Sequence, residues 1–400
     1  MKTMGSWAVT LLEVPLNFPQ RSRPWRRRRQ QQNLPHRVHV RWNMEVGPIA
    51  FSNLMRTCSR NADTNSTAAG TTSATPPPPP SSSFCGDKKG VLGLAELRES
   101  CKKWLWKGQY SINYFVSSST TGASLPNPNP PLLLVHGFGA SILHWRRNIK
   151  TLAQTHDVYA IDLLGFGNSD KPKSFPYTME AWAQLILDFL NEVVGQPTVL
   201  IGNSVGSLAC VIAASESNQN LVQGLVLLNC AGGMNNKAIV DDWRIKLLLP
   251  LLWLVDFLLK QPIIASSIFE RVKQRDSIKK ILLSIYGNKE AVDEELVEII
   301  RGPANDEGAL DAFVSIVTGP PGPNPVTLMP RISIRVLVLW GDRDPFTPLD
   351  GPVGKYFSSL PSKFSNVSLQ VLEGVGHCPH DDKPDLVHDR LLPWLAQLVA

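Results

Sequence analysis

A serine flanked by two glycines has the surroundings in this sequence that best fit a chemical role. Ser204 stands in the motif Gly202-Asn203-Ser204-Val205-Gly206, between the apolar segment 198–201 and a segment of helical pattern. A sharp strand-to-helix turn strains the backbone of its serine and requires small residues two positions before and after it. The motif predicts a nucleophilic hydroxyl, with the N–H of Val205 at a helix N-terminus to stabilise an oxyanion. The alternative is an ordinary serine in a glycine-rich turn.

A serine hydroxyl is a weak nucleophile at neutral pH, so it needs a base and a carboxylate that orients this base. The histidines that follow Ser204 in the chain are His377, His380 and His388. His377 comes after the apolar segment 368–372 and a short loop, where a residue projects above a sheet, and it is the predicted base. His380 is the second candidate.

The cluster 377–382 also holds residue types that bind zinc. Pro379 interrupts the helical spacing that two ligands on one helix would need, and the cluster is short. We therefore expect no protein-bound metal.

Two aspartates compete for the role of the orienting acid. The apolar segment 336–340 runs into Gly341-Asp342-Arg343-Asp344-Pro345. Asp344 lies further into the loop and precedes a rigid proline, which favours it and leaves Asp342 for hydrogen bonds within the loop. Spacing alone leaves both aspartates open.

A second backbone donor should complete the oxyanion hole beside Val205. The apolar segment 132–135 ends in His136-Gly137-Phe138-Gly139, and this turn predicts that the N–H of Phe138 faces the Ser204 hydroxyl. We expect His136 to be structural. Segment 162–170 likewise indicates a packed turn, because its glycines are not followed by a phosphate-binding helix.

Short apolar segments separated by helical patterns indicate the scaffold that positions these residues. They cover 132–135, 158–161, 199–201, 225–228, 336–340 and 368–372. Such continuously apolar strands are typical of a parallel sheet buried between helices, and 178–194 and 205–215 are predicted to be two of these helices. The alternating segment 110–116 predicts an edge strand in a hairpin. The expected fold class is α/β, with a mostly parallel central sheet flanked by helices.

Residues 234–330 interrupt this pattern with helical periodicity and no strand signal. An insertion at this place would form a cap over the carboxyl edge of the sheet, between core parts 87–233 and 331–400. Its most apolar run, 247–259, is apolar around most of a helix, and Leu252, Trp253 and Phe257 are candidates for contact with substrate. Burial in the protein core is an equally good explanation. The functional one is an entrance for a long apolar chain, with the protein lying on a membrane surface.

Composition narrows the remaining classes. The chain has 400 residues, 43% of them hydrophobic, which predicts a globular protein. Residues 1–86 carry eleven Lys and Arg against three acids. Because the net charge of the chain is +6, the other 314 residues sum to a net charge of −2, which argues against a nucleic-acid partner.

The Arg, Ser and Pro bias of residues 1–86 predicts an organellar transit peptide and linker, or else a solvated tail. Six scattered cysteines indicate a reducing compartment, and no apolar stretch reaches the roughly 18 residues of a membrane span.

These residues together resemble the α/β-hydrolase superfamily over about residues 100–400. The motifs that carry the resemblance are HGFGAS with HWR, DLLGFGNSDKP, GNSVGS, WGDRDPFTP and GVGHCPHDDKP. They are similar to the plant plastid branch of chlorophyll dephytylases and pheophytinases, although Ser207 stands where many relatives carry glycine. The resemblance gives Ser204, His377 and Asp344 the roles of nucleophile, base and acid, with no cofactor, and any magnesium would belong to the substrate.

The resemblance further implies a serine esterase that releases phytol from chlorophyll through an acyl-enzyme, as a peripheral protein of the chloroplast thylakoid membrane. Two alternatives stay open. A carboxylesterase, lipase, pheophytin hydrolase or C–C hydrolase would use the same three residues, because a triad does not define its acyl group. A hydrolase-fold ligand receptor would keep the triad and signal through a partner on its cap.

Overall fold

The computed structural model describes residues 93–118, 127–217, 221–235 and 254–399. The predicted transit peptide and linker, residues 1–86, lie outside the described residues, and so do Leu252 and Trp253.

A central sheet of eight strands has the order β1-β2-β4-β3-β5-β6-β7-β8. The strands are β1 (Lys102–Trp106), β2 (Tyr110–Ser117), β3 (Leu132–Val135), β4 (Val158–Ile161), β5 (Thr198–Asn203), β6 (Val222–Leu228), β7 (Arg335–Gly341) and β8 (Val367–Leu372). Strand β2 runs antiparallel to β1 and β4, and the other neighbours are parallel. The predicted α/β class with a mostly parallel sheet is confirmed.

The hairpin strand predicted at the edge of the sheet lies one place further in. Strand β1 pairs with β2, from Trp106 opposite Tyr110 to Lys102 opposite Tyr114, and forms the edge. Strand β1 has the sequence KKWLW, and Trp106 is its only buried residue. An edge strand that buries so little does not need alternating apolar and polar residues, so the sequence pattern did not reveal it. Lysines on an edge strand also discourage pairing with another chain.

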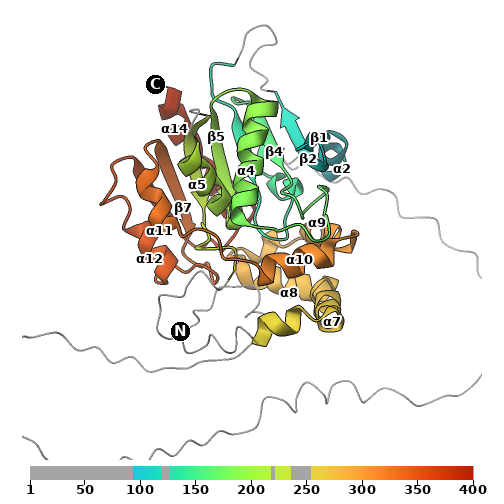
Figure 1. Ribbon diagram of the computed structural model, residues 1–400. Coiled ribbons are helices and arrows are strands. Elements are labelled where there is room, and N and C mark those ends of the chain that lie inside the picture. The colour runs from blue at the N-terminus through green and yellow to red at the C-terminus, as the bar shows by residue number, and fades with distance from the viewer. Residues whose placement is uncertain (1–92, 119–126, 218–220, 236–253, 400) are drawn as a thin grey trace, which may run out of the picture. The chain divides into compact units, whose positions relative to one another are not determined.

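Helices cover both faces of the sheet. Helices α4 (Met179–Phe189) and α5 (Val205–Glu216) pack on the face that holds Leu133 and Val135, and Figure 1 shows them side by side. Helices α2 (Leu94–Glu99), α3 (Ile149–Leu152) and α14 (Pro384–Val399) pack with Leu132 and Leu134 on the other. The predicted helix 178–194 is α-helical only to Phe189 and continues as a π-helical turn, η2 (Leu190–Val194).

Between β6 and β7 the described residues form helices and no strand. Residues 254–259 are helical, and there follow α7 (Pro262–Val272), α8 (Arg275–Ile285), η4 (Lys289–Ala291), α9 (Glu294–Arg301), η5 (Pro303–Asn305), α10 (Ala309–Thr318), α11 (Pro325–Leu328) and η6 (Met329–Arg331). Figure 1 shows α7 to α10 gathered at one end of the sheet. The other helices of the described residues are η1 (Ile142–Trp145), α12 (Pro352–Ser358) and α13 (Pro379–Asp382). In the part of the chain that is described, no helix is long and apolar enough to cross a bilayer.

Candidate active site

The turn between β5 and α5 holds Ser204 in a strained conformation, with φ of 56° and ψ of −119°. A Cβ at position 202 would lie 2.5 Å from the backbone nitrogen of Ser207, and one at position 206 would lie 2.3 Å from the carbonyl oxygen of His136. Both contacts are with backbone, which cannot turn aside, so the two glycines of the motif are required by packing. The turn therefore fixes the Ser204 hydroxyl at the carboxyl end of the sheet.

We expect Ser204→Gly to stabilise the fold. The positive φ of a serine costs about 1–3 kcal/mol, whereas the extra freedom of glycine in the unfolded chain costs about 0.4–1 kcal/mol. The net gain should be about 1 kcal/mol in the free energy of unfolding, measured by urea denaturation. Ser204→Ala is the matched control, because it removes the hydroxyl but keeps the Cβ and the strain. Equal stability of the two variants would show that the turn is relaxed.

His377 lies between Ser204 and Asp344. Its Nε2 is 2.9 Å from the Ser204 Oγ, and its Nδ1 is 2.7 Å from the Asp344 Oδ2. All three residues are buried. They follow β5, β7 and β8, so the parallel sheet brings together side chains that are far apart in the sequence. The result is a hydrogen-bonded chain of carboxylate, imidazole and hydroxyl, which is the arrangement that makes a serine nucleophilic.

The Asp344 carboxylate is held by several further donors. The side chains of Asn229 and Thr347 each donate to its Oδ2 at 2.6 Å, and the backbone N–H groups of Phe346 and Thr347 donate to its Oδ1 at 2.7 and 3.1 Å. Burial alone would raise the pKa of Asp344, but His377 and these hydrogen bonds outweigh burial and hold the pKa below its ordinary value. The carboxylate is thus ionised at neutral pH and can orient the imidazole.

Of the two aspartates that the sequence left open, the structure brings only Asp344 to His377. Asp342 is exposed, and its Oδ1 accepts the backbone N–H groups of Gly374 and Val375 at 2.7 and 3.3 Å. It therefore orders the loop that leads to His377 without touching the imidazole.

Asn203 fastens the histidine loop to the serine turn, a role that the sequence did not indicate. Its Nδ2 donates to the carbonyl of His377 at 3.0 Å and to that of Leu228 at 3.2 Å. From the cap side, the carbonyl of Ile285 in α8 accepts the backbone N–H of His377 at 2.8 Å. The ring of Phe346 meets the imidazole edge to face at 5.0 Å. The position of Asn203 directly before Ser204 is the one sequence signal that could have revealed it.

The two predicted oxyanion donors belong to segments that lie close to Ser204. Val205 begins α5, and Phe138 follows Gly137, where an added Cβ would be 3.3 Å from the Ser204 Cβ. His136 joins the two neighbouring loops, because its Nε2 accepts the N–H of Leu163 at 3.0 Å while its Nδ1 is 2.7 Å from the carbonyl of Gly137. The oxyanion hole stays a prediction that fits this placement.

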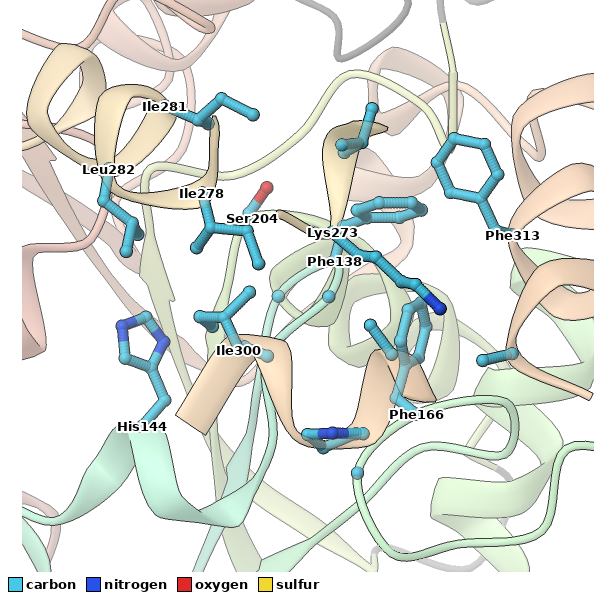
Figure 2. Close-up of a pocket in the computed structure, with 18 of the residues that line it drawn as sticks. Phe138, His144, Phe166, Ser204, Lys273, Ile278, Ile281, Leu282, Ile300 and Phe313 are labelled. Atoms are coloured by element: carbon cyan, nitrogen blue, oxygen red, sulfur yellow. The ribbon is translucent and has the colours of Figure 1, made fainter. Parts of the chain in front are cut away.

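An apolar cavity of about 140 Å³ adjoins Ser204 and His377. Its walls include Ile278 and Leu282 of α8, Phe313 of α10 and Phe138 of the loop after β3, and Figure 2 shows Ser204 among these side chains. Phe257, predicted to contact substrate, is 61% exposed and is not among the residues that line the cavity. Among the described residues between β6 and β7, helices α7, α8, α9 and α10 and the turn η5 supply the apolar lining instead.

His380, the second candidate base, lies away from Ser204 in a buried cluster. Its ring centroid is 4.1 Å from that of Trp145 and 4.6 Å from that of His144, and neither ring nitrogen has a hydrogen-bond partner. Burial, and then the nearby Arg146, lower the pKa of His380 to about 3. Among the described residues, no group of three His, Cys, Asp or Glu side chains could hold a metal ion.

The neutral burial of His380 predicts that mild acid destabilises the fold. Below its unfolded pKa of 6.5 the unfolded chain takes up a proton that the folded chain rejects down to about pH 3. His380 should therefore account for a loss of about 1.4 kcal/mol between pH ~7.5 and pH ~5.5. Burial lowers the pKa of His144 as well, so it acts in the same direction. Urea denaturation of His380→Phe, which keeps a ring against Trp145, should show this pH dependence reduced. An unchanged dependence would contradict the prediction.

The sheet order and the serine–histidine–aspartate chain at its carboxyl edge define a protein of the α/β-hydrolase type. Residues 130–384 match the family model of the alpha/beta hydrolase fold, and the chain belongs to this family. It is a hydrolase of the α/β type, as its relatives also indicate.

Two relatives illustrate the range of the family. The chain is 26% identical over 266 residues to the "Uncharacterized hydrolase YugF" of Bacillus subtilis, covering 66% of this chain and 89% of the relative. It is 24% identical over 311 residues to chloroplastic pheophytinase of Arabidopsis thaliana, covering 67% of this chain and 62% of the relative.

Solved structures share the fold. A thermophilic esterase from Thermogutta terrifontis aligns with a TM-score of 0.56 at 20% identity, over 75% of this chain and 99% of that chain. A bacterial membrane phospholipase A aligns with a TM-score of 0.55 at 22% identity, over 75% and 87%. At these identities the likeness concerns the fold alone.

Proposed function

We propose that this protein is a serine esterase that hydrolyses the phytyl ester of chlorophyll to chlorophyllide and phytol. The hydrogen-bonded chain of Ser204, His377 and Asp344 beside an apolar cavity is the observation that carries the esterase activity. The similarity to a chloroplastic pheophytinase supports a pigment ester as the substrate.

The proposed reaction assigns one role to each residue of this site. His377 accepts the proton of Ser204 as the Oγ attacks the ester carbonyl, and Asp344 stabilises the imidazolium that forms. The N–H groups of Phe138 and Val205 stabilise the oxyanion. The alcohol leaves with the proton from His377, and a water molecule activated by His377 then hydrolyses the acyl-enzyme on the propionate side of the macrocycle.

The size of the cavity restricts how such a substrate binds. A volume of about 140 Å³ is below the ~300–1,000 Å³ that is typical of pockets for drug-sized ligands. An ester with two bulky halves therefore needs the helices that line the cavity to move apart, or binds with one half outside the cavity. The apolar walls favour a hydrocarbon chain inside it.

The proposed site of action is the chloroplast, with the protein bound peripherally to the thylakoid membrane. Leu254, Phe257 and Ile263 of the cap are 51%, 61% and 86% exposed, and such side chains can insert into the boundary of a lipid layer. Residues 1–86 would act as the targeting segment. A fluorescent reporter fused to these residues should enter chloroplasts, and a reporter that stays in the cytosol would overturn the proposal.

Chromatography of pigments tests the activity. The full chain is incubated with chlorophyll in detergent beside the Ser204→Ala variant, and chlorophyllide should form with the unaltered chain alone. Pheophytin is offered in parallel, because the triad itself does not distinguish the two pigments. If the chain hydrolyses a simple acyl ester but forms no chlorophyllide, the protein is an esterase and chlorophyll is not its substrate.

A carboxylesterase or lipase that acts on another apolar ester is the second candidate, since the apolar cavity fits any hydrocarbon chain. A ligand receptor of the same fold would instead show a single slow turnover. Steady release of product by the isolated chain excludes the receptor.

A further inference from the structure

A buried carboxylate outside the serine–histidine–aspartate chain, that of Asp382, joins the segment after α8 to the histidine loop. Asp382 is 1% exposed. Its Oδ2 accepts the backbone N–H groups of Gly376 and Gly287 at 2.6 and 2.8 Å, and its Oδ1 accepts that of Asn288 at 2.7 Å. Gly376 directly precedes His377, whereas Gly287 and Asn288 follow α8 of the cap. One side chain thus holds both segments.

The two segments also touch through their backbones. The carbonyl of Ile285, the last residue of α8, accepts the N–H of His377 at 2.8 Å. A Cβ at position 376 would lie 2.0 Å from this carbonyl oxygen, and a Cβ at position 287 would lie 2.2 Å from the carbonyl oxygen of Gly374. The junction therefore has no room for side chains, and a small shift of α8 must move the histidine loop.

Helix α8 also forms a wall of the cavity through Ile278, Ile281 and Leu282. Figure 2 shows these three side chains on the same helical segment near Ser204. The same helix therefore contacts the space for substrate and the backbone of the proposed base.

A carboxylate suits this junction because it accepts hydrogen bonds at both oxygens. An asparagine of the same shape has only one side-chain oxygen. Its NH₂ group would point at one or more of the backbone N–H groups, and two donors cannot form a hydrogen bond with each other. A buried donor left without an acceptor costs about 1–3 kcal/mol. The junction would relieve this conflict by moving Gly376 or α8.

We propose that Asp382 is a positioning residue that keeps the His377 imidazole in line with Ser204 by tying the end of α8 to Gly376. The inference rests on the proposed esterase function. Asp382 acts through the backbone of the histidine loop and does not touch the reacting atoms.

Steady-state kinetics of full-length Asp382→Asn on a short p-nitrophenyl ester test the proposal, with active sites counted by a fluorophosphonate. The kcat per active site should fall about 10- to 100-fold, because a displacement of about 1 Å in a catalytic group has this effect. The KM should change less than about threefold, and the pH profile of kcat should shift. Asp342→Asn is the matched control: the Asp342 carboxylate accepts the N–H groups of Gly374 and Val375 through Oδ1 alone, so an amide oxygen can take its place, and kcat should stay within about threefold of the unaltered chain.

A spectroscopic readout separates this proposal from the esterase proposal. The downfield proton resonance of His377 Nδ1–H, bonded to Asp344, should shift or broaden in Asp382→Asn and stay in place in Asp342→Asn. If Asp382→Asn leaves this resonance unchanged, or leaves both kcat per active site and the pH profile unchanged, Asp382 is not a positioning residue. The proposed esterase activity would still stand. An unaltered chain that hydrolyses no ester overturns the esterase, and the resonance still decides the role of Asp382. Should Asp382→Asn fail to fold, Gly287→Ala disturbs the same junction from the cap side and should show the same changes.

Discussion

Ser204→Ala should lower kcat for ester hydrolysis by roughly 10⁵- to 10⁶-fold. The substitution removes the Oγ that lies 2.9 Å from His377 Nε2, so the imidazole has no hydroxyl to deprotonate and no acyl-enzyme can form. The oxyanion donors and the cavity remain, and they account for the small residual rate. Hydrolysis of a p-nitrophenyl ester measures the loss, and covalent labelling by a fluorophosphonate should disappear with it.

Ser207→Ala is the control for this variant. Ser207 is a neighbouring buried serine whose hydroxyl donates to the carbonyl of Gly202 at 2.6 Å and accepts the N–H of Leu228 at 3.2 Å. It supports the turn without facing His377, so the variant should still react with the fluorophosphonate. Retention of more than about a hundredth of the activity in Ser204→Ala would place the nucleophile elsewhere.

The serine turn and the parallel strands could be predicted because their signals are local. The apolar segments 132–135 and 158–161 are strands β3 and β4 with the same bounds. A strand that is buried on both faces is apolar along its whole length, so its ends coincide with the ends of the apolar segment. Gly202 and Gly206 are required by backbone contacts within a few residues of Ser204 or with the adjacent strand. The sequence signal of each feature is short, although the contacts that require Gly206 are with Val135 and His136, far away in the sequence.

The lining of the cavity could not be predicted in the same way. Apolar periodicity shows that a helix buries one face, but it does not show which partner covers that face. The apolar run 247–259 made Phe257 a candidate, but Phe257 does not line the cavity, whereas Ile278 and Leu282 of the more polar α8 do. Leu252 and Trp253 of the same run lie outside the described residues, so their prediction stays open. The junction at Asp382 was hidden for a similar reason, because it depends on backbone groups 94 to 95 positions away.

Asp344→Asn should lower kcat by about 10⁴-fold, the second largest expected effect. The carboxylate accepts from His377 Nδ1 at 2.7 Å and thereby keeps the Nε2 lone pair directed at Ser204. An asparagine can turn its amide group toward the imidazole and favour the opposite tautomer, in which Nε2 carries the proton and cannot accept another. Kinetics on the p-nitrophenyl ester measure the loss, and KM should change little because Asp344 lies away from the substrate.

Asp342→Asn decides between the two aspartates of the loop. Its side chain is exposed and accepts the backbone N–H groups of Gly374 and Val375 through Oδ1, so an amide oxygen can take its place. Asp344, in contrast, is buried among Asn229, Thr347 and His377, and its depressed pKa keeps it charged for the imidazolium that forms during the reaction. A larger loss in Asp342→Asn than in Asp344→Asn would reverse the assignment, and equal losses would mean that the loop matters only through its fold.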